Sequence, residues 1–280
     1  MPRDAPITNA SWRARLALAF ERRGDRTVLA SREHEGPLVV QKALHPEGDR
    51  VCHTIVVHPP GGIAGGDALT VAIRANEGAH ALLTTPGAAK WYRSAGPWAE
   101  SRIDIDAGPH SIVEWLPQES IVFDGALARW RWTARLAPGA RVFAWDIVCL
   151  GRTGSGERFT RGAVGLDVRI VRDARSLWVE RGLIEPGSRA VESPAGLAGH
   201  AVFGTLVLAG ADIDDGTLSE CRALLPAQGE GAVTRMPDLF VARYRGDSSE
   251  AARRFFTGLW TILRPRSLGR AAVEPRIWRT

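Results

Sequence analysis

The stretch ARWRWTARL, at residues 128–136, alternates apolar and polar side chains with a period of two. One set consists of Ala128, Trp130, Trp132, Ala134 and Leu136, and the other of Arg129, Arg131, Thr133 and Arg135. Successive side chains of a β-strand point to opposite faces, so this pattern predicts a strand with one buried and one solvated face. The same alternation recurs at residues 12–20, 103–106, 142–150, 164–171, 177–183 and 202–208.

These strands are expected to build stacked sheets. A sheet with one apolar face must bury that face against another layer, and one-sided alternation is typical of antiparallel sheets. The sequence therefore predicts a mainly β fold, a large and predominantly antiparallel scaffold of stacked sheets. No repeat of fixed period indicates a solenoid, and no linker rich in proline, serine and glycine divides the chain, so one β-rich domain spanning residues 1–280 is expected.

Two helices are expected late in the chain. The first covers residues 217–225, and its apolar face consists of Leu218, Cys221 and Leu225. The second begins at Asp247, which can act as N-cap while Glu250 completes a capping-box-like pair. Its apolar stripe consists of Ala252, Phe255, Phe256, Leu259, Trp260 and Leu263. Pro265 is expected to end this helix, because proline disfavours the α conformation in the residue before it.

The charge distribution argues against nucleic acid as the partner. The net charge is +5 at pH 7, but most arginines are interleaved with acids at alternating strand positions, as on a solvated sheet face. The exception is residues 253–279, where seven arginines face one acid, Glu274. This surplus suits an acidic surface on a partner protein. Ile277 and Trp278 add an apolar pair to the same tail, and they can either pack back on the domain or dock on a partner.

Cysteine usage and the absence of targeting signals indicate the cytoplasm. The three cysteines, Cys52, Cys149 and Cys221, are far apart and form no Cys-x-x-Cys pair, which argues for a reducing compartment and against a structural zinc site. No apolar run is long enough for a membrane helix, and the first residues lack the apolar core of a signal peptide. We therefore expect a cytoplasmic protein that binds neither membranes nor nucleic acid.

A glycine-rich segment, HPPGGIAGGD at residues 58–67, joins two apolar runs. The simplest interpretation is a long structural hairpin loop in which Gly65 and Gly66 take positive φ. A phosphate-binding loop is disfavoured, because no Gly-Lys-Ser/Thr sequence follows. Cys52 and His58 share a strand face and Asp67 can return beside His58, which would give an open set of N, O and S ligands for a borderline metal such as nickel.

Three acids interrupt apolar runs, namely Asp67, Asp146 and Glu180. A buried carboxylate is costly unless a cation, an arginine or water compensates its charge. Two interpretations stay open. Each acid can form an ion pair with one of the many arginines, or the acids can line a polar path that lets cations pass through the protein.

Signals for enzymatic chemistry are weak. The sequence contains no Gly-x-Ser-x-Gly, His-Glu-x-x-His or Walker A motif. Glu114 and Glu119 flank a loop, and a β-rich protein with paired carboxylates can be a carbohydrate-active hydrolase. This enzyme class is the alternative function.

Six motifs follow one another along nearly the whole chain. They are HPPGGIAGGD at residues 58–67, TTPGAAKWYRS at residues 84–94, WLPQESIVFDG at residues 115–125, WDIVCLGRTGSGER at residues 145–158, SPAGLAGHAVFGTL at residues 193–206 and PRIWRT at residues 275–280. Taken in order, they resemble the urease accessory protein family UreD, also called UreH. Six ordered motifs are far more specific than any one of them.

The resemblance implies a non-enzymatic maturation factor of urease. A UreD protein is expected to be a β-rich metallochaperone scaffold that binds apo-urease and the helical accessory protein UreF, which in turn recruits the GTPase UreG. Ni²⁺ is expected to pass transiently through its interior, with no tightly bound cofactor and no catalytic residue. The candidates for the nickel path are His58, Asp67, Asp146 and Glu180. The candidates for partner binding are Phe255, Phe256, Arg276, Ile277 and Trp278.

Overall fold

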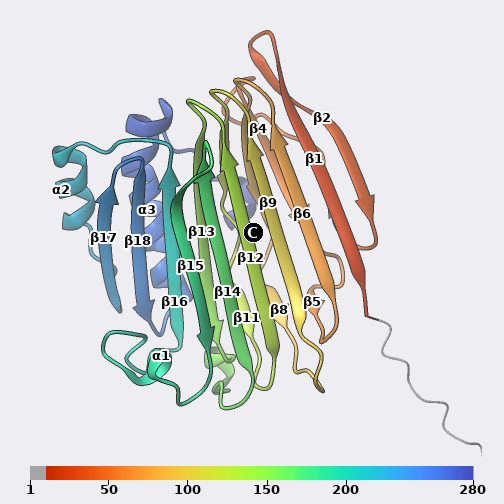
Figure 1. Ribbon diagram of the computed structural model, residues 1–280, viewed down its shortest axis with the longest axis vertical. Helices are drawn as coiled ribbons and strands as arrows, with labels where there is room; N and C mark the ends of the chain where they lie inside the picture. Colours follow the sequence, from red (N-terminus) through yellow and green to blue (C-terminus); the bar gives the residue numbers. More distant parts are fainter. Residues whose placement is uncertain (1–10, 280) are drawn as a thin grey trace, which may run out of the picture.

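The computed structural model describes residues 11–279, which form two β-sheets and a layer of helices (Figure 1). The first sheet has seven strands. In spatial order they are β15 (Arg175–Ile184), β14 (Ala163–Arg172), β12 (Leu127–Leu136), β9 (Ala99–Ala107), β6 (Ala68–Ala75), β1 (Arg13–Arg23) and β2 (Arg26–Glu35).

The second sheet has eleven strands and lies behind the first in Figure 1. Its main order is β17 (Glu230–Met236), β18 (Leu239–Gly246), β16 (Val202–Ala209), β13 (Arg141–Leu150), β10 (Ile112–Trp115), β7 (His80–Thr84), β4 (Val51–Val57) and β3 (Val39–Val40). Three short strands pair beside this path, namely β5 (Gly62–Ile63), β8 (Ala89–Trp91) and β11 (Ser120–Val122).

Between β4 and β14 the chain visits the two sheets in turn, as in a solenoid. The strands β4, β7, β10 and β13 lie in the eleven-stranded sheet, and β6, β9, β12 and β14 lie in the seven-stranded sheet. Neighbours within each set are parallel. The expected mainly β fold is confirmed, but the expected predominance of antiparallel pairing is wrong. Period-two alternation reports which face of a strand is buried, and it says nothing about the direction of the neighbouring strand.

Antiparallel pairing is found at the two ends of this arrangement. At one end β1 pairs with β2 and β3 with β4, and at the other β14 pairs with β15 and β13 continues into β16, β18 and β17. The strands β17 and β18 follow residue 208, beyond the last strand that the sequence pattern predicts. Figure 1 shows that these two strands extend past β15, the edge of the seven-stranded sheet.

Two apolar cores hold the three layers together. The first lies between the sheets and contains the apolar face of β12, including Trp130 and Trp132, as the alternation predicts. The rings of Trp91 and Trp130 are 4.3 Å apart within it. The second core lies between the eleven-stranded sheet and the helices, and it contains Phe256 and Trp260. Each buried aromatic side chain removes a large apolar area from water, which stabilises the fold.

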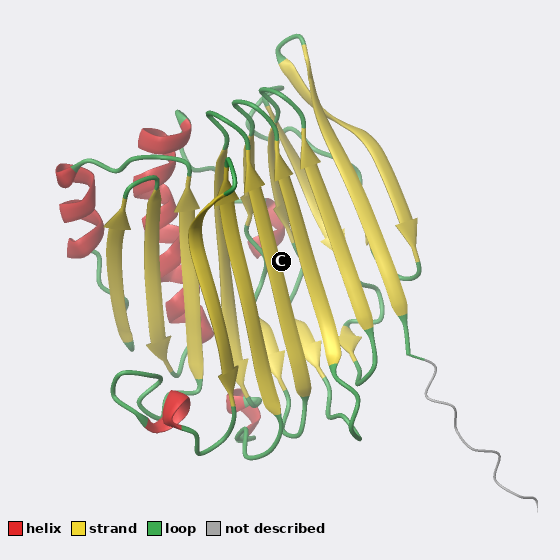
Figure 2. Cartoon of the chain, in the orientation of Figure 1, coloured by secondary structure: helices red, strands yellow, loops and turns green. Residues whose placement is uncertain are grey.

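The helices are α1 (Arg189–Glu192), α2 (Asp215–Ala223) and α3 (Ser249–Leu268), with 3₁₀ turns η1 (Thr153–Ser155) and η2 (Arg276–Arg279). Figure 2 shows that α2 and α3 lie to one side of the strands. The two late helices are confirmed with corrected ends. α2 begins two residues before the expected start, because Asp214 accepts a hydrogen bond from the backbone N–H of Thr217 at 2.8 Å. No helix of the described chain has the length and apolar character needed to cross a membrane.

The boundaries of α3 differ from the expectation at both ends. Ser248, not Asp247, is the N-cap, and its hydroxyl accepts a hydrogen bond from the N–H of Ala251. At the other end the helix continues through Pro265 to Leu268 and stops at Gly269, which has φ of 70°. Proline removes a backbone donor, but tertiary contacts of its buried neighbour Arg264 hold the chain in the helical conformation.

Candidate functional site

A cavity of about 250 Å³ lies between the two sheets. Most of its lining is apolar and includes Trp91, Trp115 and Trp130. His58, directly after β4, and Asp146, in the middle of β13, are among its polar lining residues. Two neighbours of Asp146 on alternate positions, Ala144 and Val148, belong to the core between the sheets, so Asp146 faces the seven-stranded sheet.

Two neighbouring spaces share lining residues with this cavity. A smaller one of about 40 Å³ shares Asp146 and adds Glu180. An outer one of about 550 Å³ shares His58 and adds Asp67 and Tyr92. The structure therefore brings the four candidates for a cation path onto one series of spaces, although they come from three separate segments of the sequence.

Asp146 is a half-buried carboxylate without a counter-ion. No side chain within residues 11–279 forms an ion pair or a hydrogen bond with it. Burial and, to a smaller extent, the negative charge of Glu180 raise the pKa of Asp146 to about 7. The deprotonated carboxylate offers two free oxygens to a cation. The ion-pair interpretation is therefore wrong for Asp146.

Glu180, by contrast, does have an arginine partner. Its Oε1 accepts a hydrogen bond from Nη1 of Arg243 at 2.6 Å. Glu180 pairs with Val168 in the register of β15 and β14, and both residues line the small cavity with Asp146. The ion-pair interpretation is confirmed for Glu180, but the carboxylate still faces a space that it shares with a second acid.

Asp67 closes the turn that precedes β6. Its Oδ1 accepts a hydrogen bond from the N–H of Trp12, and its Oδ2 accepts one from the N–H of Ala64, both at 2.8 Å. Backbone donors therefore compensate this carboxylate, which pairs with no arginine among the described residues. Asp67 holds the wall of the outer space, and its charge acts on His58.

His58, which lines two of these spaces, has one nitrogen without a partner among the described residues. Its Nε2 is buried and has no hydrogen-bond partner in the part of the chain that the structure describes. Burial lowers the pKa of His58, and the charge of Asp67 offsets only part of this effect. The imidazole is therefore neutral at pH 7 and keeps a lone pair that can bind a metal.

Cys52 lies elsewhere. It is completely buried in the core between the sheets and lines none of the three spaces, so the expected N, O and S set is not formed. Nowhere in residues 11–279 do three His, Cys, Asp or Glu side chains converge as a metal-binding group. The arrangement is an open series of single donors, which fits a passing cation better than a resident one.

The glycine loop needs its glycines for two different reasons. Gly66 has φ of 94°, as expected, whereas Gly65 does not have positive φ. A Cβ on Gly65 would lie 2.3 Å from Oγ of Ser94 and 3.0 Å from the carbonyl oxygen of Pro97, so this glycine is required by close packing.

Replacing Gly66 by valine should strain the backbone by about 1 kcal/mol or more, because a β-branched residue disfavours positive φ. We expect a lower melting temperature and less recovered protein. Gly87→Ala is the matched control, since Gly87 has no positive φ and no atom within 4 Å of an added Cβ. Equal melting temperatures for the two variants would show that the Gly66 conformation carries no strain.

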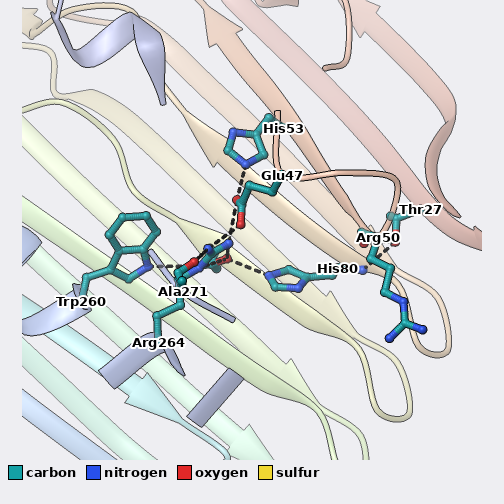
Figure 3. A network of polar contacts seen from close by, with 9 residues as sticks. Thr27, Glu47, Arg50, His53, His80, Trp260, Arg264 and Ala271 are labelled. Carbon is teal, nitrogen blue, oxygen red and sulfur yellow. Dashed lines mark hydrogen bonds and ion pairs between the residues drawn. The ribbon is translucent and has the colours of Figure 1, made fainter. Parts of the chain in front are cut away.

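Figure 3 shows a buried polar network in which His80, Trp260, Arg264 and Glu47 point toward one another. The network is centred on Glu114. Its carboxylate accepts hydrogen bonds from Nε2 of His80 at 2.7 Å, from Nε1 of Trp260 at 2.7 Å and from the guanidinium of Arg264. Arg264 also pairs with Glu47, which contacts His53 at 2.6 Å. The network therefore ties α3 to β7, to β10 and to the segment before β4.

Glu114 is ionised in this network. Burial alone would raise its pKa, but the contacts of His80 and Arg264 lower the pKa to about 2. Glu114 is 0% exposed, so a sugar cannot reach it. Glu119 is held by an ion pair with Arg253. The geometry gives no support to the alternative of a carbohydrate-active hydrolase, in which both carboxylates must flank a bound sugar.

The candidate partner-binding residues divide between core and surface. Phe255 and Phe256 are 3% and 0% exposed and pack between α3 and the eleven-stranded sheet, so neither is available to a partner. A broad apolar stripe indicates that a helix buries one face, but it does not tell which surface covers that face. Here the eleven-stranded sheet of the same chain covers it. Arg276 is exposed.

The C-terminal tail packs back on the protein. The ring of Trp278 lies 5.6 Å from that of Trp145 and 5.9 Å from that of Trp260, and its Nε1 donates a hydrogen bond to Oγ1 of Thr84 at 2.8 Å. Trp278 and Ile277 remain partly accessible. Packing on the domain is therefore confirmed for Trp278, and a role of this tail in partner binding stays a prediction.

Comparison with known proteins assigns the family. Residues 13–279 match the model of the family described as UreD urease accessory protein. The chain belongs to the UreD family. It is 54% identical over 269 residues to urease accessory protein UreD of Azoarcus sp., covering 96% of this chain and 94% of that relative. It is 50% identical to UreD of Dechloromonas aromatica, with 100% and 99% covered, and 52% identical to UreD of Pseudomonas aeruginosa, with 96% of each covered.

Membership of the UreD family confirms the resemblance that the six motifs carry. The relatives are named as accessory proteins, which agrees with an accessory rather than a catalytic role. The Glu114 network is the part of the site region that sequence reasoning missed. A signal was present, because Glu114 interrupts an apolar run just as Asp146 does, and Arg264 stands beside the apolar stripe of its helix.

Proposed function

We propose that this UreD chain is a non-catalytic scaffold that passes Ni²⁺ to apo-urease. The observation that carries the proposal is Asp146, a half-buried carboxylate that lacks a counter-ion and lines two adjoining cavities, with Glu180 in the second. A carboxylate that lines an internal cavity without a counter-ion does not favour stability, because its partial desolvation is costly. Transient binding of a passing cation would explain why this carboxylate is present.

The donor chemistry suits a borderline divalent metal that must move on. The donors are the neutral imidazole of His58 and single carboxylates at Asp146 and Glu180, each on a different segment. Imidazole and carboxylate both bind Ni²⁺, but a site with one or two protein donors holds it weakly compared with a closed thiolate site. Ni²⁺ is here the cargo, and no resident cofactor is proposed.

The proposed partners are apo-urease, UreF and, through UreF, the GTPase UreG. The proposed compartment is the cytoplasm, where the free thiols of Cys52, Cys149 and Cys221 stay reduced. Neither a membrane nor nucleic acid is a proposed partner. The basic tail with its exposed Arg276 is the proposed contact for UreF.

Replacing Arg276 by glutamate should weaken capture of UreF by roughly fivefold, the effect of about 1 kcal/mol at an exposed charge. The far-UV circular dichroism should not change, because the side chain is exposed. Arg222→Glu, an exposed site on α2, makes the same charge change and is the control. Capture of UreF at the wild-type level by Arg276→Glu would remove the tail from the proposed interface.

The accessory function is tested by urease maturation in cells that lack this gene. Urease should assemble as a protein but contain little nickel, and the chain supplied from a plasmid should restore the nickel and pull down UreF. Fully loaded urease in the absence of the gene, at limiting nickel, would contradict the proposed function.

A further inference from the structure

An arginine, Arg243, contacts two residues that line the small cavity of Asp146 and Glu180. The registers of β13, β16 and β18 place Asp146, Thr205 and Arg243 side by side in one row across the eleven-stranded sheet. Asp146 lines the cavity at the inner end of this row, and Thr205 lines it next. The Arg243 side chain, at the outer end, is 44% exposed.

Two contacts hold the guanidinium of Arg243 against the lining of this cavity. Its Nη1 donates hydrogen bonds to Oε1 of Glu180 at 2.6 Å and to Oγ1 of Thr205 at 2.7 Å. Glu180 is on β15, in the opposite sheet, so Arg243 bridges the two sheets. The guanidinium also lies 5.5 Å from the centre of the Trp178 ring, which lines the same cavity.

Arg243 lies on β18, near the edge at which the seven-stranded sheet ends and the eleven-stranded sheet continues. β15 is the last strand of the seven-stranded sheet, and β18 belongs to the part of the other sheet that extends past it (Figure 1). The half-exposed guanidinium therefore stands between solvent and a cavity that holds two carboxylates. A divalent cation that leaves by this end must separate Arg243 from Glu180, because the arginine occupies the carboxylate oxygen and repels the cation.

We propose that Arg243 is the gate at this end of the cation path, closed while it pairs with Glu180 and open when its guanidinium leaves that carboxylate. This inference rests on the proposed nickel transfer and adds its regulation. Glu180 is the one carboxylate that pairs with Arg243 within residues 11–279. An anion that draws the guanidinium of Arg243 away from Glu180 must therefore come from outside the described chain. We infer that a carboxylate of a protein docked against the edge formed by β15 and β18 is this anion.

The test measures nickel retention in the complex of this chain with UreF and UreG. The complex is loaded with Ni²⁺ and freed of excess metal, and the rate of nickel loss to a colorimetric chelator is followed without urease. Arg243→Met keeps the length of the side chain and removes its charge and its hydrogen bonds. We expect nickel loss roughly fivefold faster than from the wild type, the effect of losing a partly exposed ion pair.

Two further variants make the result specific. Thr205→Val removes one of the two anchors of Arg243 without changing its charge, and it should give an intermediate rate of nickel loss. Arg181→Met breaks an exposed ion pair with Asp167 on the other face of β15, and it should lose nickel at the wild-type rate. If Arg243→Met does not fold, the rate of nickel loss from Thr205→Val tests the gate instead: a rate equal to that of the wild type would contradict it.

The outcomes separate this inference from the proposed function. If Asp146→Asn and Glu180→Gln lower delivery of nickel to urease but neither Arg243→Met nor Thr205→Val speeds nickel loss, the gate is wrong and the path stands. If the two acid variants deliver nickel as the wild type does, the path itself is wrong. Nickel loss from the double variant Arg243→Met/Glu180→Gln should be no faster than from Glu180→Gln alone, because that substitution already breaks the pair; a further increase would contradict the gate.

Discussion

Replacing Glu114 by alanine is expected to cost about 3–5 kcal/mol of folding stability, the largest single effect in this protein. The substitution leaves Arg264 and His80 buried beside an empty space, with Glu47 as the other carboxylate of the network. The charge of Arg264 is then poorly compensated in a region that excludes water. The cost should appear as a lower midpoint in urea unfolding.

A matched control is Glu21→Ala, which removes a carboxylate from an exposed ion pair with Arg23. Exposed pairs contribute about 0–1 kcal/mol, so this variant should unfold close to the wild type. If Glu114→Ala unfolded at the same urea concentration as Glu21→Ala, the network would not stabilise the contact between α3 and the sheets.

The same network predicts the response of the protein to acid. The pKa of Glu114 falls from its ordinary value of 4.5 to about 2 in the folded protein. A carboxyl group whose pKa is lowered by folding contributes stability above its unfolded pKa, and this contribution is lost as the pH falls from about 4.5 through about 2. Glu114→Gln should lose less stability than the wild type over this interval.

Replacing Asp146 by asparagine is expected to stabilise the fold above neutral pH while it lowers nickel transfer severalfold. Folding raises the pKa of Asp146 from 3.8 to about 7, so the charged form costs stability, in part above pH 3.8 and in full above pH 7. At pH 8 the variant should gain on the order of 2 kcal/mol. The gain should vanish as the pH falls toward 4. Urea unfolding at pH 8, 6 and 4 measures it.

Asp106→Asn is the control, because Asp106 lies on the solvated face of β9 and pairs with exposed Arg135. It should show no gain at pH 8. A loss of stability at pH 8 in Asp146→Asn would mean that the carboxylate has a compensating partner. A gain of stability together with a loss of delivery is the mark of a residue kept for function.

The sequence predicts which strand faces are buried better than it predicts how the strands connect. The alternation of residues 128–136 identifies the inner face of β12, with Trp130 and Trp132 in the core. Whether neighbouring strands are parallel depends on how the chain between them runs, because parallel strands need a crossover connection. Period-two alternation carries no information about these connections. Pro265 is misleading for a related reason, because the contacts of Arg264 override a local preference.

The sequence identifies the acidic residues of the candidate site, but it does not identify the side chains that contact them. An acid inside an apolar run marks Asp146, Glu180 and Glu114 equally well. The structure gives Glu114 three donating side chains, gives Glu180 one arginine, and leaves Asp146 unpaired. The partners come from strands and helices far away in the chain, so a single sequence cannot assign them.

The amount of nickel per urease active site shows whether Asp146 and Glu180 carry nickel to urease. Cells at limiting nickel should express urease and its accessory proteins with wild-type chain, Asp146→Asn, Glu180→Gln or the control Asp106→Asn, and the recovered complexes and urease should be quantified together. We predict intact complexes for all four, with nickel in urease lowered severalfold by Asp146→Asn and Glu180→Gln alone. Fully loaded urease with both path variants, in intact complexes, would contradict this prediction.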